Sequence, residues 1–212
     1  MGDTAARFST GIRFLDMEIG GGIPVGDIVA LTTPPESQSE ALFRELARVQ
    51  DTHYVSTICA DESELEQWVA PPGRESGALS VAYGEPGEVL GDPVALVEEI
   101  PPDSCCIVDP VDLLEDGGRG EYLAALDALK DRLRAVGSVG ILHGLATESS
   151  PANRPLTVKR ADHVWQLDRR VDGGEVSTTL LISKSRGNSV PQEAISIELA
   201  EQVRIDTSRN IA

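Results

Sequence analysis

Short apolar runs and stretches with helical spacing follow one another along this chain, and their order predicts a layered α/β fold. Runs typical of strands cover 25–31, 53–60, 79–83, 105–109, 139–142, 161–167, 176–182 and 193–199. Helical patterns cover 42–49, 61–69, 92–100 and 121–136. Because strands that alternate with helices pair in parallel, the pattern predicts a central, mostly parallel sheet flanked by helices.

The segments between these elements carry turn signals, and the two ends of the chain lack a pattern. We expect a turn-rich connection at 84–91, an acidic loop at 112–120, a mobile loop at 144–159 and a charged turn at 169–175. Residues 1–8 and 204–212 are expected to be flexible ends. The length between them, 9–203, suits a single domain.

The stretch 24–50 has the frame of a nucleotide-binding loop. A strand leads through a tight polar loop into a helix, which is the setting of the motif G-x-x-x-x-G-K-[ST]. In that motif, backbone N–H groups cradle the phosphates and the Lys reaches the terminal ones. The four motif positions are taken here by Thr33, Gln38, Ser39 and Glu40. None of them matches, so the frame is present without its phosphate-binding chemistry.

The residues inside the loop bring acidic charge and a different way to begin the helix. Glu36 and Glu40 add carboxylates, and unit charges about 4 Å apart interact by roughly 4 kcal/mol at an effective dielectric near 20. Repulsion of that size opposes a polyphosphate. The S-x-x-E order also predicts a capping box, in which Ser37 Oγ accepts from the N–H of Glu40 and Glu40 reaches back. An ordinary turn that never bound a ligand is the alternative.

The residues before the loop form a long ordered motif, TGIRFLDMEIGGGIPVG. It resembles the opening T-G-x-x-x-L-D-x-x-x-G-G-G-[IL]-P-x-G of KaiC-like members of the RecA superfamily. The matching positions are Thr10, Gly11, Leu15, Asp16, Gly20, Gly21, Gly22, Ile23, Pro24 and Gly26. The resemblance covers roughly 10–199 and implies a RecA-like P-loop fold with the loop register given above.

Three further strand ends resemble positions that serve ATP chemistry in that family. The run from Cys105 to Asp109 resembles the strand whose final Asp helps to hold Mg²⁺. Without a phosphate loop, we interpret Asp109 as a remnant or as a polar strand end. Asp61 and Glu62 follow a strand where the family carries an acidic pair, although they equally suit a helix N-terminus. His143, at a strand tip, matches a γ-phosphate sensor or caps the strand.

The sequence KSRG at 184–187 is similar to the K-x-R-G motif of KaiC-like proteins. The resemblance implies that Lys184 and Arg186 reach a neighbouring protomer. There they would pair with carboxylates such as Glu36 or Glu40. A solvated basic turn is the alternative.

Residues 144–160 occupy the place of a DNA-binding loop in RecA-like recombinases. The segment offers Arg154, Lys159 and Arg160 but no aromatic side chain on which a base could stack. Contact with single-stranded DNA therefore stays an alternative rather than the main interpretation.

The amino-acid composition limits the kinds of partner that this protein can bind. Asp and Glu number 35 against 18 Lys and Arg, the formal net charge is −17, and Lys occurs three times. An acidic, Lys-poor surface is typical of proteins from a salt-loaded cytoplasm, where salt screens the self-repulsion. We expect a halophilic archaeal host and little affinity for nucleic acid, whose phosphates bind clustered Lys and Arg.

No cofactor or metal centre is expected. Cys59, Cys105 and Cys106 lie in predicted strands without metal-binding spacing, and the three His residues are scattered. We expect ATP with Mg²⁺ as a ligand only under the alternative in which the atypical loop still binds a nucleotide. The chain has no signal peptide and no apolar run that could span a membrane, so we expect a cytoplasmic protein.

Together these observations predict a catalytically degenerate RecA/KaiC-like ATPase homologue, a pseudo-ATPase that acts as a regulatory or assembly partner. Its own partner would be a second copy in a homo-oligomer or an active KaiC- or RecA-like paralogue. Two alternatives stay open. One is a KaiC-like ATPase with an atypical loop, and the other is a recombinase-like accessory protein in DNA repair.

Overall fold

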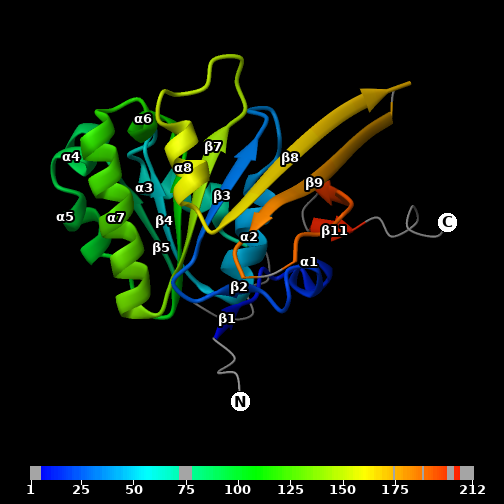
Figure 1. The fold of residues 1–212 in the computed structure, drawn as a ribbon, viewed down its shortest axis with the longest axis horizontal. Helices are drawn as coiled ribbons and strands as arrows, with labels where there is room; N and C mark the ends of the chain where they lie inside the picture. The colour runs from blue at the N-terminus through cyan, green and yellow to red at the C-terminus, as the bar shows by residue number, and fades with distance from the viewer. Residues whose placement is uncertain (1–5, 72–77, 174, 188, 200–202, 206–212) are drawn as a thin grey trace.

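The computed structural model describes residues 6–71, 78–173, 175–187, 189–199 and 203–205, which build a large sheet with helices on both faces (Figure 1). The strands are β1 (Arg7–Phe8), β2 (Ile23–Pro24), β3 (Ile28–Thr33), β4 (Asp51–Ser56), β5 (Leu79–Tyr83), β6 (Ser104–Asp109), β7 (Val139–Leu145), β8 (His163–Asp172), β9 (Glu175–Ser185), β10 (Ile195–Leu199) and β11 (Val203–Ile205). The helices are α1 (Arg13–Glu18), α2 (Glu40–Val49), α3 (Glu62–Val69), α4 (Pro86–Gly91), α5 (Pro93–Glu98), α6 (Asp112–Glu115), α7 (Arg119–Val136) and α8 (Arg154–Arg160).

Within the described residues the main sheet has nine strands in the order β11-β10-β9-β8-β3-β7-β6-β4-β5. From β8 to β5 each neighbouring pair is parallel, whereas β9, β10 and β11 extend the sheet with antiparallel pairs. The prediction of a mostly parallel sheet flanked by helices is confirmed. β3 lies between β7 and β8, so the loop that follows it sits at the middle of the carboxyl edge of the sheet.

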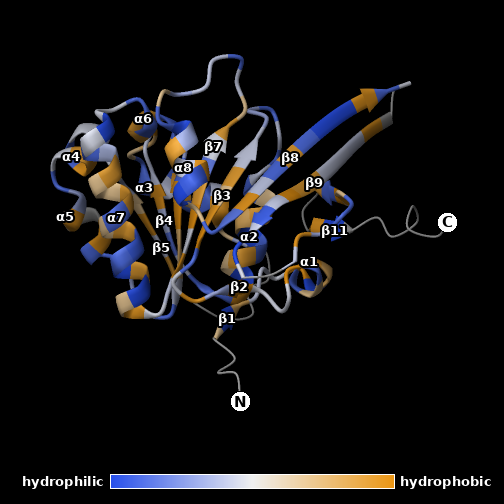
Figure 2. Ribbon diagram, in the orientation of Figure 1, coloured by the Kyte–Doolittle hydropathy of each residue, from blue (hydrophilic) through white to orange (hydrophobic). Residues whose placement is uncertain are grey.

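Two apolar clusters fill the layers on either side of the sheet. One packs α1, α2 and α3 against it and includes the fully buried Phe43 and Leu65. The other packs α4 to α8 and includes Leu126 and Leu133 of α7. As the sequence predicts, α7 ends at Gly137, which takes the left-handed conformation at φ 73°. Figure 2 shows the apolar residues gathered on the central strands and a hydrophilic stretch along the outer part of β8.

The glycine-rich motif near the amino end has a structural role. The three glycines 20–22 have φ between 79° and 110°, and they turn the chain so that β2 pairs antiparallel with β1. Asp16 accepts hydrogen bonds from the hydroxyl of Ser9 (2.5 Å) and from both the N–H and the hydroxyl of Thr10 (2.8 Å each). Thr10 and Asp16 therefore bind each other, which fixes the entry to α1.

Three expected loops contain helices, so those predictions were wrong in part. The segment 84–91 contains α4, which begins where the Glu85 side chain accepts from the N–H of Glu88 (2.7 Å). The segments 112–120 and 144–159 contain α6 and most of α8. In each case a short helix forms, although Gly or Pro in the sequence suggests a turn, and of the three only α4 begins with a side-chain cap.

The charged turn expected at 169–175 was also wrong, because β8 continues to Asp172 and β9 begins at Glu175. Arg7 and Phe8 belong to β1, and residues 204–205 belong to β11, so neither is part of a loose end. The remainder of the expected flexible ends, 1–5 and 206–212, lies outside the described residues. Among the helices that the structure describes, none has the length and apolarity needed to cross a membrane.

Replacing Gly22 with Ala should lower the free energy of unfolding by about 1–3 kcal/mol. At φ 110° an L side chain is strained, and a Cβ would also overlap the carbonyl oxygen of Phe8. Gly120→Ala, in the first turn of α7, is the matched control, because a Cβ there meets nothing within 4 Å. This change should raise the free energy of unfolding by roughly 0.4–1 kcal/mol. Urea unfolding measures both variants, and a Gly22→Ala variant as stable as the parent would refute the structural role.

Candidate functional site

The loop that joins β3 to α2 closes on its own backbone. The N–H of Ser37 donates to the carbonyl of Pro34 (2.9 Å), and the N–H of Ala41 donates to the carbonyl of Gln38 (3.0 Å). A phosphate cradle needs such N–H groups to be free and directed at the ligand. Here they are used within the chain.

The predicted capping box is wrong. Ser39, just before α2, already has helical dihedrals (φ −59°, ψ −26°), and its side chain makes no capping bond. Ser37 Oγ is buried and has no hydrogen-bond partner among the described residues. The box would require a helix that starts at Gln38, but α2 starts at Glu40, so Ser37 lies too far ahead to serve its first turn.

The motif positions of the loop provide no cation. Thr33 is the fully buried last residue of β3, and Ser39, at the lysine position, is 4% exposed. Gln38 and Glu36 are exposed, and Glu40 is half-buried. The place of the phosphate-binding lysine is therefore held by a small, neutral and buried side chain.

A chain of hydrogen bonds joins the carboxyl ends of four parallel strands. Asp109 of β6 accepts from the hydroxyl of Tyr54 in β4 and binds Nδ1 of His143 in β7 through Oδ1 (2.5 Å). Nε2 of His143 lies 2.8 Å from Oγ1 of Thr33 in β3. With a carboxylate at Nδ1, that nitrogen donates, and in neutral His143 Nε2 accepts from Thr33. Burial, and then the charge of Asp109, raise the pKa of Tyr54, so the phenol stays protonated and donates.

The order Thr33, His143, Asp109 has the geometry of a nucleophile, its base and an orienting carboxylate. Thr33 has no exposed surface, however, and His143 is 3% exposed. A substrate cannot reach a hydroxyl buried to this extent. The contacts therefore hold the strand ends together, and they occupy both oxygen atoms of Asp109 that a Mg²⁺ ion would use.

Lys184 and Arg186 lie at the opposite, amino end of the central strands, where β9 pairs with the start of β8. The ammonium of Lys184 donates to three carbonyls at the C-terminal end of α8, at 2.5 to 3.1 Å. Burial and the neighbouring Arg186 lower the pKa of Lys184. Arg186 binds Asp162 through Nε (3.0 Å) and remains 62% exposed. Lys184 thus has an internal role, and the reach of Arg186 to a neighbouring protomer stays a prediction.

Asp61 begins a helix. Its Oδ1 accepts from the N–H groups of Ser63 (3.0 Å) and Glu64 (3.2 Å), which are the first donors of α3. Of the two interpretations of this acidic residue, the geometry favours the helix N-cap.

Structural contacts also engage the segment 144–160. Arg154 donates through Nε to Glu115 (2.6 Å) and through Nη2 to Asp112 (2.8 Å). Glu115 has no exposed surface and accepts a further hydrogen bond from the hydroxyl of Thr157. Burial raises the pKa of Glu115, against the opposing pull of Thr157 and Arg154. Arg154 is therefore committed to a buried carboxylate and is unavailable to a DNA strand.

The cysteines give no metal centre. Cys105 and Cys106 are buried in β6, as predicted, but Cys59 lies beyond the end of β4 and is half-buried, so its assignment to a strand was wrong. Within the described part of the chain, no group of three or more His, Cys, Asp or Glu side chains is placed to hold a metal ion.

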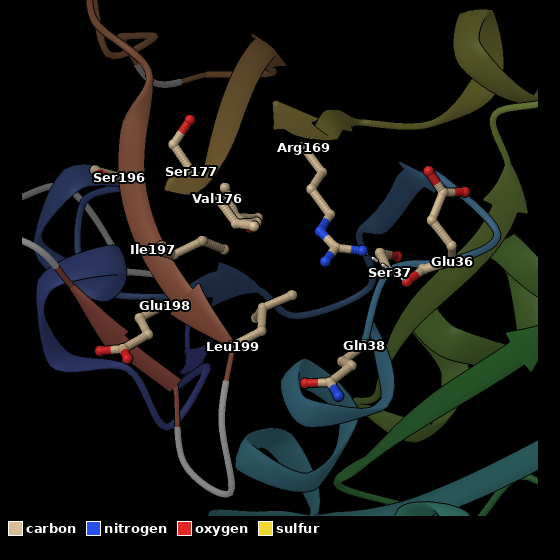
Figure 3. Close-up of a pocket in the computed structure, with 11 residues that line it drawn as sticks. Glu36, Ser37, Gln38, Arg169, Val176, Ser177, Ser196, Ile197, Glu198 and Leu199 are labelled. Atoms are coloured by element: carbon tan, nitrogen blue, oxygen red, sulfur yellow. Dashed lines mark hydrogen bonds between the residues drawn. The ribbon is translucent and has the colours of Figure 1, made fainter. Parts of the chain in front are cut away.

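A pocket of about 480 Å³ lies beside the loop (Figure 3). Its walls come from Glu36, Ser37 and Gln38 of the loop and from the outer strands β8, β9 and β10. Arg169 of β8 projects into it, and its Nη1 donates to the carbonyl of Glu36 (3.4 Å). The loop predicted to be the remnant of a nucleotide site thus forms one side of this pocket.

Sequence reasoning missed two residues of this region, Tyr54 and Arg169. Tyr54 lies within a predicted strand, where a buried hydroxyl needs a hydrogen-bond partner. Arg169 lies two residues beyond Leu167, so in a continued strand both side chains share one face. The expected turn at 169–175 hid that periodicity.

Comparison with known proteins agrees with this geometry. Residues 7–212 match the model of a family of unknown function (DUF7125). The chain belongs to this family. No curated protein sequence matches it. Its fold is similar to that of the KaiC-like protein PH0186 from the hyperthermophilic archaeon Pyrococcus horikoshii OT3, with a TM-score of 0.74 and 18% identity over 95% of this chain and 99% of that one. The DUF7125 chain thus has a KaiC-like fold, and a likeness at this identity concerns the fold alone.

Replacing Tyr54 with Phe should lower the free energy of unfolding by about 1–2 kcal/mol, because the buried Asp109 carboxylate loses a donor. Tyr83→Phe is the control, since Tyr83 lies on the edge strand β5, is 44% exposed and should change stability by less than about 0.5 kcal/mol. Denaturant unfolding of the two variants provides the measurement. Equal effects would mean that the Tyr54 hydroxyl does not support Asp109.

Replacing Arg154 with Met should cost roughly 3–5 kcal/mol, because Glu115 would be left buried without its cation. Arg160→Met is the matched control. Arg160 pairs with Asp127 on the surface, where both side chains are about half exposed, and such pairs contribute about 0–1 kcal/mol. Thermal and urea unfolding distinguish the two, and a mild effect of Arg154→Met would show that the segment is not held as described.

Proposed function

We propose that this DUF7125 protein is a catalytically inactive relative of KaiC-like ATPases, a pseudo-ATPase that acts as a regulatory or assembly partner. The observation that carries the proposal is Ser39. It is buried and neutral at the position where a phosphate-binding loop places its lysine. Without that cation, a polyphosphate loses its main attractive contact in the loop.

The surroundings of Ser39 add to this loss. Glu36 and Glu40 carry negative charge beside the position of the phosphates. The N–H of Ser37 is bonded to Pro34 rather than directed outward. Each of these features raises the free energy of a bound polyphosphate, and they act together because they lie within one short loop.

Magnesium chemistry is disfavoured for a separate reason. Mg²⁺ in nucleotide sites is held mainly by phosphate oxygens and by one or two protein oxygens. The protein oxygens at this position belong to Asp109, and both already bind Tyr54 or His143. A metal ion would have to compete with those buried hydrogen bonds.

A role in assembly remains for the exposed basic group at the end of β9. Arg186 is anchored by Asp162 through Nε and keeps its guanidinium 62% exposed. In a chain of net charge −17, an exposed and oriented Arg suits a carboxylate on a second protein. Glu36, exposed at the other end of the parallel strands, offers such a group on a second copy of the chain.

Thermal unfolding with Mg-ATP tests the proposal. The parent protein should show no shift in Tm, whereas a ligand at 100 times its Kd would add about 2.7 kcal/mol to stability. A variant with Glu36→Gly, Gln38→Gly, Ser39→Lys and Glu40→Thr rebuilds the core of the motif and should gain a shift.

The control variant carries Ser39→Ala with the same three other substitutions. It removes the acidic groups without adding the lysine, so it should stay insensitive to Mg-ATP. A clear stabilisation of the unmodified protein by Mg-ATP would overturn the proposal.

A further inference from the structure

The pocket beside the loop is formed where two strands of the outer sheet separate. β10 pairs with β9 only as far as the partners Ile197 and Thr178, whereas β9 stays paired with β8 out to Glu175. The space between the diverging strands is closed on its remaining side by residues 36–38 of the loop. Its volume of about 480 Å³ lies in the range of small-molecule sites.

One cation projects into this space. Of the described residues that line the pocket, Arg169 alone is a Lys or Arg, and Figure 3 shows its guanidinium directed between the loop and β10. Within the described part of the chain it makes one hydrogen bond, the long contact of Nη1 with the carbonyl of Glu36 (3.4 Å). A guanidinium has five N–H donors, so most of them are available to a ligand.

A buried hydroxyl in the same wall lacks a partner. Ser37 is 9% exposed, and among the described residues its Oγ makes no hydrogen bond. An unsatisfied buried hydroxyl costs about 1–3 kcal/mol. Ser37 lines the pocket, but its Oγ has less than 1 Å² of accessible surface, so the hydroxyl reaches a ligand only if the loop shifts.

The opposite wall mixes aliphatic side chains with the hydroxyl-bearing Ser177, Thr178 and Ser196. In Figure 3 the side chains of Val176, Ile197 and Leu199 face the space that Arg169 enters, whereas the carboxylates of Glu36 and Glu198 point away from it. Among the described residues, the pocket therefore combines one cation with a branched aliphatic surface. A polyphosphate does not suit it, because one guanidinium cannot neutralise several charges near two carboxylates.

We propose that this pocket binds a small monocarboxylate with a branched aliphatic body. The carboxylate receives two parallel N–H bonds from Arg169. The aliphatic body packs on Ile197 and Leu199. This site goes beyond the pseudo-ATPase role, because it needs neither a nucleotide nor the lost lysine. A ligand there would bridge the loop before α2 and the strands β9 and β10.

Isothermal titration calorimetry with 4-methylpentanoate tests the proposal. Saturable binding at millimolar concentration or below is expected, and the neutral isostere 4-methylpentanamide should bind at least about tenfold more weakly, because it lacks the charge that Arg169 recognises. Inorganic phosphate should not displace the carboxylate. Equal binding of acid and amide, displacement by phosphate, or no saturable heat at all would overturn the proposal.

Variants locate the binding. Arg169→Gln should weaken 4-methylpentanoate at least about tenfold, whereas Arg170→Gln should leave it unchanged, because Arg170 is 81% exposed and pairs with Asp168. Arg169→Lys keeps the charge but loses the paired N–H donors, so it should weaken binding by a smaller factor, and it serves alone if Arg169→Gln fails to fold. Binding that survives the change of Arg169 at full strength would place the ligand elsewhere. The Mg-ATP experiment is independent, so failure here leaves the pseudo-ATPase proposal intact.

Discussion

The carboxylate of Asp109 sets the main constraint on the carboxyl edge of this sheet. A largely buried charge must be hydrogen-bonded, since its desolvation otherwise costs several kcal/mol. Asp109 is 15% exposed, and it is satisfied by Tyr54 and His143 from the strands on either side. His143 also forms a hydrogen bond with Thr33 of β3. The ends of β4, β6, β7 and β3 are therefore held together. The position where the KaiC-like pattern places a metal ligand thereby becomes a structural clamp.

A second buried ionic cluster holds the amino edge of the same strands. Asp162 accepts from Lys130, from the N–H of Ile28 (2.9 Å) and from Arg186 (3.0 Å). Burial alone would raise the pKa of Asp27, but the hydrogen bond from His163 and the charge of Lys130 outweigh it and hold that pKa below its ordinary value. In a chain with three lysines, Lys130 is used here and Lys184 at the end of α8, which explains why cations persist at these two places in so acidic a protein.

Much of the fold could be predicted from the sequence, because it rests on periodicity and on backbone constraints that single residues reveal. The apolar run that ends at Asp109 predicted the strand β6, and the helical spacing over 121–136 predicted where α7 ends, just before Gly137. The outer part of the β8 and β9 ribbon escaped prediction because it leaves the body of the protein, so Arg169 takes a position in the apolar series of Trp165, Leu167 and Val171 that burial would reserve for an apolar side chain. The sequence did not predict helix α4. Its first turn depends on a hydrogen bond that the N–H of Glu88 donates to the Glu85 side chain, whereas the surrounding Gly and Pro residues suggest a turn.

The site was less predictable than the fold, and the reason is physical. Spacing identified which loop positions differ from the phosphate-binding motif, but the capping box depended on the dihedrals of Ser39, which no spacing specifies. The motif residues that match the KaiC-like pattern carry backbone constraints: Asp16 receives three hydrogen bonds, and Gly22 takes a conformation that other residues rarely adopt. A phosphate-binding lysine has no comparable role in folding, because its partner is the ligand. A chain can therefore replace it by Ser39, keep the fold, and leave the adjoining pocket around Arg169 for other chemistry.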